Sequence, residues 1–174
     1  MGSQGTTEKY SLWLTPTGDV YERLARILDT LSVRYGAPGF APHVTLLGSI
    51  AAPRSEVIQK TAQLAASLRP FPLHLERIDY LDEYFRCLFV RVALTRPLRE
   101  AYQRASVLFA RRDRFSFMPH LSLLYGNFSL SAKEKAKAEW GPRVDLTFKA
   151  RSLHVYSTQG EPRRWRRAAR FGLE

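Results

Sequence analysis

Cysteine, long apolar segments and acidic residues are all scarce in this sequence. Cys87 is the only cysteine, so no disulfide can form within the chain. No stretch approaches the run of about 18 apolar residues that a membrane-spanning helix needs, and the first residues lack the basic and apolar segments of a secretory leader. These absences argue against a disulfide-stapled secreted domain and against a helical membrane protein. We therefore expect a soluble cytoplasmic protein with no membrane partner.

The shortage of acidic residues leaves the chain strongly positive. The 174 residues include 27 Lys and Arg against 16 Asp and Glu, which gives a formal charge of +11. The arginines concentrate in two segments, one with Arg111, Arg112 and Arg114, the other with Arg163, Arg164, Arg166, Arg167 and Arg170. Such a charge attracts nucleotides or RNA, and it is equally typical of a solvated basic face.

Hydrophobic periodicity predicts short strands and helices that alternate irregularly. Strands are expected at 10–14, 43–50, 73–81, 87–94, 120–125, 144–148, 153–157 and 165–173, the last at a sheet edge. Helices are expected from Asp19 to a cap at Gly36, from Pro53 to Leu68, after Pro97, and from a capping box of Ser131 and Glu134 to Trp140. This order is not the strict repeat of a doubly wound sheet, so it indicates an α+β fold. With no low-complexity linker, residues 1–174 are expected to form a single domain.

Two of the histidines stand in the same local sequence. Pro42-His43-Val44-Thr45-Leu46 and Pro119-His120-Leu121-Ser122-Leu123 both fit the pattern Pro-His-apolar-Ser/Thr-Leu. Because side chains alternate along a strand, each histidine shares a face with the hydroxyl two residues later, whereas the apolar residues face the other way. If the two strands are neighbours, two imidazoles and two hydroxyls meet in one pocket.

Two imidazoles in one pocket are suited to proton transfer at both ends of a breaking bond. With an ordinary pKa of about 6.5, one ring can be neutral and act as a base while the other is charged and acts as an acid. The hydroxyls of Thr45 and Ser122 can donate hydrogen bonds to the oxygens of a phosphate, on which negative charge grows in the transition state. This chemistry requires no metal and no cofactor.

These motifs resemble those of the two-histidine phosphoesterases, and most closely those of the cyclic phosphodiesterases of the plant and yeast type. The second motif continues as His120-Leu121-Ser122-Leu123-Leu124-Tyr125-Gly126, and the opening Tyr10-Ser11-Leu12-Trp13-Leu14 and the chain length are also similar. The resemblance implies a bilobal α+β fold of two pseudo-symmetric lobes, each with an antiparallel sheet backed by helices. It places the active-site cleft between the lobes.

The resemblance also implies an activity and a set of site residues. The implied reactions are hydrolysis of ADP-ribose 1″,2″-cyclic phosphate to the 1″-phosphate and of nucleoside 2′,3′-cyclic phosphates to 2′-phosphates. His120 is then the base that activates water, and His43 is the acid that protonates the leaving oxygen. Thr45 and Ser122 contact the phosphate, and Tyr125 lines the substrate site. The expected partner is a small cyclic phosphate or an RNA 3′ end, and the expected enzyme is a monomer.

Other interpretations stay open from the sequence. An enzyme of the 2′,5′ RNA ligase type would process cyclic-phosphate ends of longer strands, whereas a basic RNA-binding module would carry incidental histidines. A zinc site is disfavoured, since Cys87 stands alone and no closely spaced ligand pair exists. His74 and His154 are expected to be structural. Trp13 and Phe85 are expected to pack in the core, with stacking on a base as the alternative.

Overall fold

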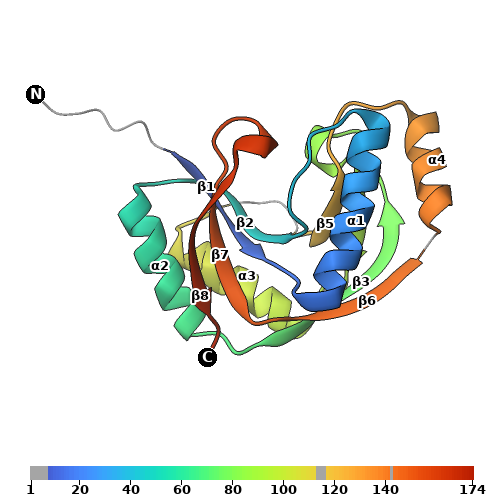
Figure 1. The fold of residues 1–174 in the computed structure, drawn as a ribbon. Coiled ribbons are helices and arrows are strands. Elements are labelled where there is room, and N and C mark those ends of the chain that lie inside the picture. The colour runs from blue at the N-terminus through green and yellow to red at the C-terminus, as the bar shows by residue number, and fades with distance from the viewer. Residues whose placement is uncertain (1–7, 113–116, 142) are drawn as a thin grey trace, which may run out of the picture.

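The computed structural model describes residues 8–112, 117–141 and 143–174, so Arg114 of the first arginine segment lies outside the described residues. The strands are β1 (Lys9–Leu14), β2 (Val44–Ala51), β3 (Phe71–Asp79), β4 (Leu88–Val92), β5 (His120–Leu124), β6 (Arg143–Ala150), β7 (Ser152–Ser157) and β8 (Arg166–Gly172). The helices are α1 (Gly18–Tyr35), α2 (Arg54–Ala66), α3 (Arg96–Leu108) and α4 (Leu130–Trp140), with short 3-10 turns at Tyr84–Arg86 and Pro162–Arg164 (Figure 1). The predicted α+β class is confirmed.

All eight strands belong to one antiparallel sheet with the order β6-β3-β4-β5-β2-β1-β7-β8. Its two four-stranded halves, named here the β5 half (β6-β3-β4-β5) and the β2 half (β2-β1-β7-β8), meet where β2 lies beside β5. A single residue pair, Val44 with Leu121, joins them. The two expected lobe sheets are thus continuous through a narrow seam, and β8 is the edge strand that the sequence predicts.

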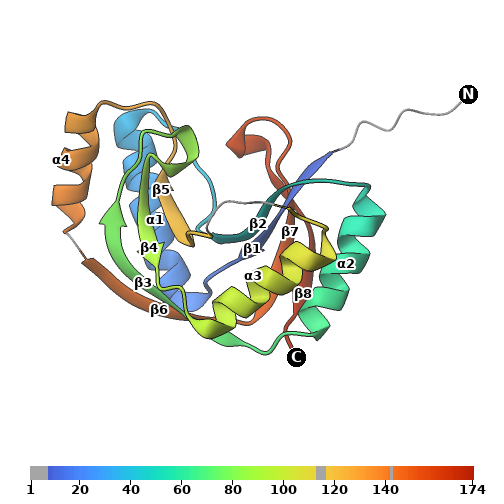
Figure 2. The same ribbon diagram turned by 180° about the vertical axis from the view of Figure 1, so that it is seen from behind.

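Helices α1 and α3 each pack on the half of the sheet opposite to the strand that they follow in the chain. Helix α1 follows β1 of the β2 half but packs on β5 and β6, whereas α3 follows β4 of the β5 half but packs on β2. Helix α2 packs on β7 and β8. Figures 1 and 2 show α2 and α3 at one end of the molecule and α1 and α4 at the other. Each half therefore receives a helix from the segment that follows a strand of the other half.

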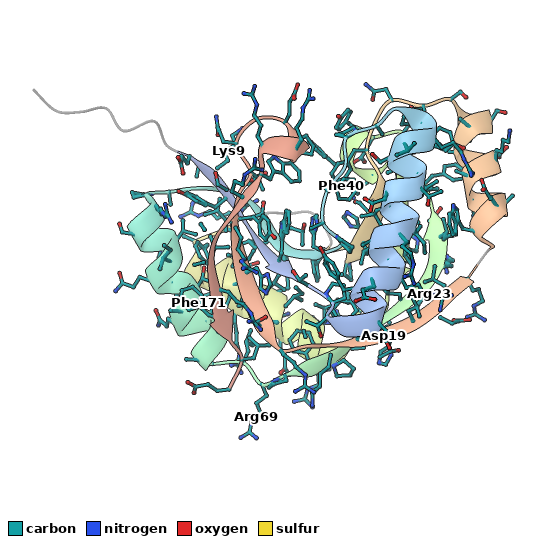
Figure 3. All side chains as sticks on the ribbon, viewed as in Figure 1. Lys9, Asp19, Arg23, Phe40, Arg69 and Phe171 are labelled. Atoms are coloured by element: carbon teal, nitrogen blue, oxygen red, sulfur yellow. The ribbon has the colours of Figure 1, made fainter. Side chains whose placement is uncertain are left out.

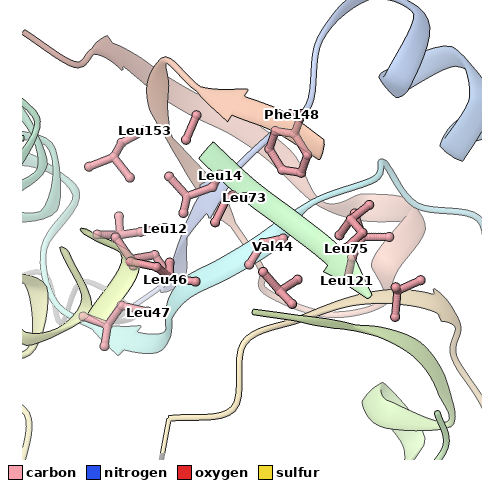
Figure 4. Close-up of a cluster of buried hydrophobic side chains, with 14 of the residues drawn as sticks. Leu12, Leu14, Val44, Leu46, Leu47, Leu73, Leu75, Leu121, Phe148 and Leu153 are labelled. Carbon is pink, nitrogen blue, oxygen red and sulfur yellow. The ribbon is translucent and has the colours of Figure 1, made fainter. Parts of the chain in front are cut away.

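The two motif strands bury one row of apolar side chains. Val44, Leu46, Leu121 and Leu123 are each at most 2% exposed, and they belong to the core with Leu12, Leu14, Leu73 and Leu75 (Figure 4). Full burial of such a side chain contributes about 1.5–3 kcal/mol to folding. The intervening histidines and hydroxyls consequently face the other side of the sheet.

No helix in the described part of the chain is long and apolar enough to cross a membrane.

Helix ends agree with the sequence at one site and differ at another. Gly36 caps α1 in the left-handed conformation, with φ of 60°, as predicted. The predicted capping box of Ser131 and Glu134 is wrong. Ser129 is the cap of α4, where its Oγ accepts a hydrogen bond from the Ala132 amide at 3.2 Å. Both serines suit a cap by residue type, and the start of the helix is set by the chain just before it, where Phe128 packs against the core.

Candidate active site

The two motif strands bring the predicted site residues into one cavity. With Val44 opposite Leu121 in an antiparallel pair, position 43 lies across from position 122 and position 45 across from position 120. All of these side chains line a single cavity of about 410 Å³, named here the histidine cavity. The five residues predicted from the sequence, His43, Thr45, His120, Ser122 and Tyr125, are all among its lining residues. The structure therefore places them together, while their chemical roles stay predictions.

Each imidazole is oriented by the same local hydrogen bond. The Nδ1 atom of His43 lies 2.7 Å from the carbonyl oxygen of Ala41, and the Nδ1 atom of His120 lies 3.0 Å from that of Met118. A carbonyl oxygen can only accept, so Nδ1 carries the hydrogen in both rings. In each motif the proline between the two residues favours an extended backbone before it. The duplicated Pro-His sequence thus leaves Nε2 of each ring as the atom that can exchange a proton.

His43 is enclosed by aromatic side chains. It is 4% exposed and stacks on Trp13, with ring centroids 3.5 Å apart and an interplanar angle of 6°. Burial lowers the pKa of His43 to about 3, and the nearby His120 adds to this effect, whereas the hydrogen bond to Ala41 opposes it. The ring is therefore neutral in the empty cavity near neutral pH.

His120 lies in a more open and more charged environment. It is partly exposed, and its ring and that of Phe89 form a T-shaped pair with centroids 5.3 Å apart. Burial lowers the pKa of His120, and the positive charges of Arg86 and Arg91 lower it further, while the hydrogen bond to Met118 and the charge of Glu83 act in the opposite direction. Both imidazoles thus favour the neutral form before substrate binds.

The hydroxyl groups differ in how they are engaged. Ser122 donates from Oγ to the carbonyl oxygen of Phe85 at 2.9 Å, so a phosphate contact requires its hydroxyl to turn. Thr45 is partly exposed and has no side-chain hydrogen bond to any described residue. Tyr125 is 3% exposed and stacks on Phe40 at 3.8 Å. Burial raises the pKa of Tyr125 well above its ordinary value, so its hydroxyl stays protonated and can donate.

Sequence reasoning missed lining residues that come from the start of β1 and from the loop after β7. They include Lys9, Ser11, Thr158, Gln159 and Trp165. Lys9 is the only Lys or Arg among the described lining residues, and it supplies positive charge to the cavity. Apart from Ser11, which lies in the segment Tyr10–Leu14, these residues belong to no recognisable motif, and only the sheet topology brings them to the two histidines.

The aromatic residues divide into a buried stack and an open mouth. Trp13 is stacked by His43 on one side and by Tyr156 on the other, at 3.5 and 3.7 Å, so the expectation that it packs internally is confirmed. Phe85, in contrast, is 51% exposed, and core packing is wrong for it. Its ring centroid lies 6.0 Å from that of Trp165, and both side chains line the cavity. These two rings are therefore the surfaces that a substrate ring can reach.

The arginine segments border the site without filling it. Arg111 donates from Nη1 to the backbone carbonyls of Gly48 and Ser49, at 2.7 and 3.1 Å, and both of these residues line the cavity. Arg112 is exposed. In the second segment, Arg163 pairs with Glu161. No described arginine of either segment lines the cavity itself.

The other histidines and the cysteine lie away from the cavity. His154 is 7% exposed, with Nε2 3.0 Å from the Ser152 hydroxyl, and His74 contacts Thr147 at 3.0 Å. Neither histidine lines the histidine cavity, which agrees with their expected structural role. Cys87 is buried. The described residues contain no cluster of three or more His, Cys, Asp or Glu side chains suited to hold a metal.

Comparisons with known proteins agree with this geometry. The family model described as the 2′-5′ RNA ligase superfamily matches residues 12–162. A protein of Arabidopsis thaliana named cyclic phosphodiesterase is 26% identical over 156 residues, which cover 87% of this chain and 86% of that protein.

Solved structures share the fold. Escherichia coli LigT complexed with 3′-AMP superimposes with a TM-score of 0.62 at 16% identity, covering 97% of this chain and 99% of LigT. TT0787 of Thermus thermophilus gives a TM-score of 0.66 at 16% identity, covering 95% of this chain and 97% of that one. These likenesses confirm the bilobal α+β fold. Because the family model matches most of its length, the chain belongs to the 2′-5′ RNA ligase superfamily of two-histidine phosphoesterases.

Proposed function

We propose that the protein is a metal-independent phosphodiesterase that hydrolyses small cyclic phosphodiesters. The observation that carries the proposal is that two imidazoles, each with Nδ1 held by a carbonyl, line one cavity together with two hydroxyls. The similarity to a plant protein named cyclic phosphodiesterase supports the same substrate class. The substrates we propose are nucleoside 2′,3′-cyclic phosphates and ADP-ribose 1″,2″-cyclic phosphate.

The proposed reaction needs one proton removed and one supplied. Nε2 of one imidazole takes a proton from water as the water oxygen forms a bond to phosphorus. Nε2 of the other, in its charged form, gives a proton to the 3′ oxygen as the bond between that oxygen and phosphorus breaks. The products are a nucleoside 2′-phosphate from the 2′,3′-cyclic substrate and, by breakage at the 2″ oxygen, a 1″-phosphate from the ADP-ribose substrate. Each proton transfer typically contributes about 10²- to 10⁴-fold to the rate.

Other lining residues act on the phosphate charge. In this proposal Thr45 and Ser122 donate hydrogen bonds to the nonbridging oxygens, where negative charge increases in the transition state. Lys9 attracts the anionic substrate into the cavity. The negative phosphodiester also raises the pKa of both histidines when it binds, so that one of them becomes an acid at neutral pH.

The family resemblance and the burial of the two rings favour different histidines as the acid. The resemblance assigns the base to His120 and the acid to His43, and this order stays a prediction. Burial favours the opposite order, because His43 is the ring that more strongly resists a positive charge. The face of Trp13 stacked on His43 offsets part of this resistance, since an aromatic face attracts a cation. A substrate with an activated leaving group separates the two orders, because only the variant that lacks the acid regains activity with it.

An RNA 3′ end that carries a 2′,3′-cyclic phosphate is a second candidate substrate. The observation that favours it is the position of Phe85 and Trp165 at the cavity, followed along the chain by Arg166 and Arg167. Exposed aromatic rings next to arginines are typical of surfaces that bind single-stranded nucleic acid. We propose a monomeric, single-domain cytoplasmic enzyme in either case.

Direct assay distinguishes these candidates. The protein is incubated with the four nucleoside 2′,3′-cyclic phosphates, with ADP-ribose 1″,2″-cyclic phosphate and with an oligonucleotide that ends in a 2′,3′-cyclic phosphate, and kcat/KM values are compared. We expect turnover to 2′-phosphates, unchanged by EDTA and with a bell-shaped pH profile from the two histidines. Salt-sensitive RNA binding without any turnover would instead support the binding module and overturn the proposal.

A further inference from the structure

A second cavity lies on the opposite face of the sheet from the histidine cavity. It has a volume of about 260 Å³ and is enclosed by residues of α1, α4 and strands β3 to β6. Ile78, Val90 and Leu123 form part of its apolar wall. Leu123 directly follows Ser122 along β5, so the two side chains point to opposite faces. The two cavities thus share strand β5, but no described residue lines both.

Three arginines stand around this second cavity, named here the arginine cavity. Arg23 and Arg26 come from α1 and Arg143 from the start of β6, and Figure 3 shows Arg23 on the side of α1 turned toward β6. Arg23 and Arg26 form no ion pair or side-chain hydrogen bond with any described residue. The closest carboxylate to Arg143 is that of Asp145, at 3.8 Å, and no described lining residue is acidic. The cavity therefore gathers positive charge without a matching set of carboxylates, which favours an anion.

A buried donor in the same place lacks a partner. Trp140 ends α4 and lines the arginine cavity. Its indole nitrogen is buried and has no hydrogen-bond partner among the described residues. A buried donor left unpaired is unfavourable, but this nitrogen has almost no exposed surface, so a ligand oxygen reaches it only if the Trp140 ring turns.

We propose that the arginine cavity binds a small carboxylate with an apolar body, such as a medium-chain fatty acid. A guanidinium presents parallel N–H donors that match a carboxylate. The apolar part of the ligand packs against Ile78, Val90 and Leu123. At about 260 Å³ the cavity lies below the roughly 300–1,000 Å³ typical of sites for drug-sized ligands, which favours a short chain.

Nuclear magnetic resonance of the indole N–H groups tests this proposal. The chain has three tryptophans, and the Trp140→Phe variant identifies the Trp140 signal by its loss. We expect sodium octanoate to shift that signal to saturation. We expect neither 1-octanol, which has the apolar body without the charge, nor inorganic phosphate, which has charge without the apolar body, to do so. A saturating shift with octanol or phosphate instead of octanoate, or no saturating shift at all, would overturn the proposal.

Paired variants test the part played by the arginines. The double variant Arg23→Gln/Arg26→Gln is expected to bind octanoate about tenfold or more weakly, since charge-assisted hydrogen bonds contribute about 1.5–3 kcal/mol. Both side chains are exposed, so the variant is expected to keep its fold, which circular dichroism checks. Arg69→Gln, an exposed arginine on the α2–β3 connection that Figure 3 labels well away from Arg23, is the matched control and should bind octanoate normally. Equal octanoate affinity in the double variant and the control would contradict the proposal.

Discussion

The β2 half and the β5 half present the same motif in two different environments. In both, a proline precedes a histidine whose Nδ1 bonds to the carbonyl two residues earlier, at 2.7 Å for His43 and 3.0 Å for His120. Around that shared geometry the neighbours differ. His43 is stacked face to face on Trp13, whereas His120 forms a T-shaped pair with Phe89 and lies near the charges of Arg86 and Arg91.

This difference shows how one local sequence can supply two chemical roles. The backbone near each histidine fixes which nitrogen faces the cavity, and this depends only on the motif. The ease of protonating that nitrogen depends on burial and nearby charge, which come from other strands. An acid and a base can therefore arise from a duplicated motif once the surrounding halves diverge.

The largest expected effect is the loss of either motif histidine. His43→Ala and His120→Ala are each expected to lower kcat/KM for a nucleoside 2′,3′-cyclic phosphate by at least about a hundredfold, since each removes a proton-transfer group. His74→Ala, on the exposed surface away from the cavity, is the matched control and should retain full activity. Circular dichroism confirms that the variants fold. Full activity in either motif variant would show that the histidine of that half is not needed for catalysis.

Removal of the hydroxyls is expected to have a smaller effect. Thr45→Val and Ser122→Ala each delete a donor to a charged phosphate oxygen, which contributes about 1.5–3 kcal/mol, so kcat/KM should fall about tenfold or more. Ser122 already donates to the Phe85 carbonyl, so its variant also tests whether that bond holds the cavity in shape. Steady-state kinetics of the two variants compares the halves directly. Activity unaffected by Thr45→Val would show that the β2 half does not hold the phosphate through its hydroxyl.

The last expected effect is on stability and not on activity. Burial lowers the pKa of His43 from its ordinary 6.5 to about 3 in the folded protein. Between about pH 6.5 and 3, His43 therefore binds a proton in the unfolded chain but not in the folded protein. The free energy of unfolding should thus fall as the pH falls through this range, with His43 contributing up to about 1.4 kcal/mol per pH unit.

Urea unfolding at several pH values checks this contribution. His43→Gln should flatten the pH dependence more than His120→Gln does, because His43 is the more deeply buried ring. His154, whose pKa burial lowers to about 4, contributes in the same direction in both variants and so cancels in the comparison. Equal slopes in the two variants would show that the halves bury their histidines alike.

Much of the fold and the centre of the site were predictable from the sequence because they depend on short-range pattern. Strand alternation separates His43 and Thr45 from Val44, and a glycine after a helical stripe marks the end of α1 at Gly36. The start of α4 was misplaced because two nearby serines satisfy the same capping rule, and the sequence does not show which one the tertiary packing selects.

The periphery of the site was not predictable because it depends on pairing between distant strands. Lys9 reaches the cavity from the first strand, and Trp165 reaches it from beyond the seventh. Phe85 could not be separated from a core residue by its type, since its exposure follows from the loop between β3 and β4. Long-range register, which no local motif encodes, decides the positions of Lys9 and Trp165.

In the proposed mechanism the imidazoles of the two halves act on one phosphate. Nitrogen-15 resonances of the histidine rings, followed while a nucleoside 2′-phosphate is added, test this most directly. We expect the Nε2 signals of both His43 and His120 to shift with the same dissociation constant, while those of His74 and His154 do not move. A response from only one motif histidine, or two responses with different dissociation constants, would contradict that mechanism.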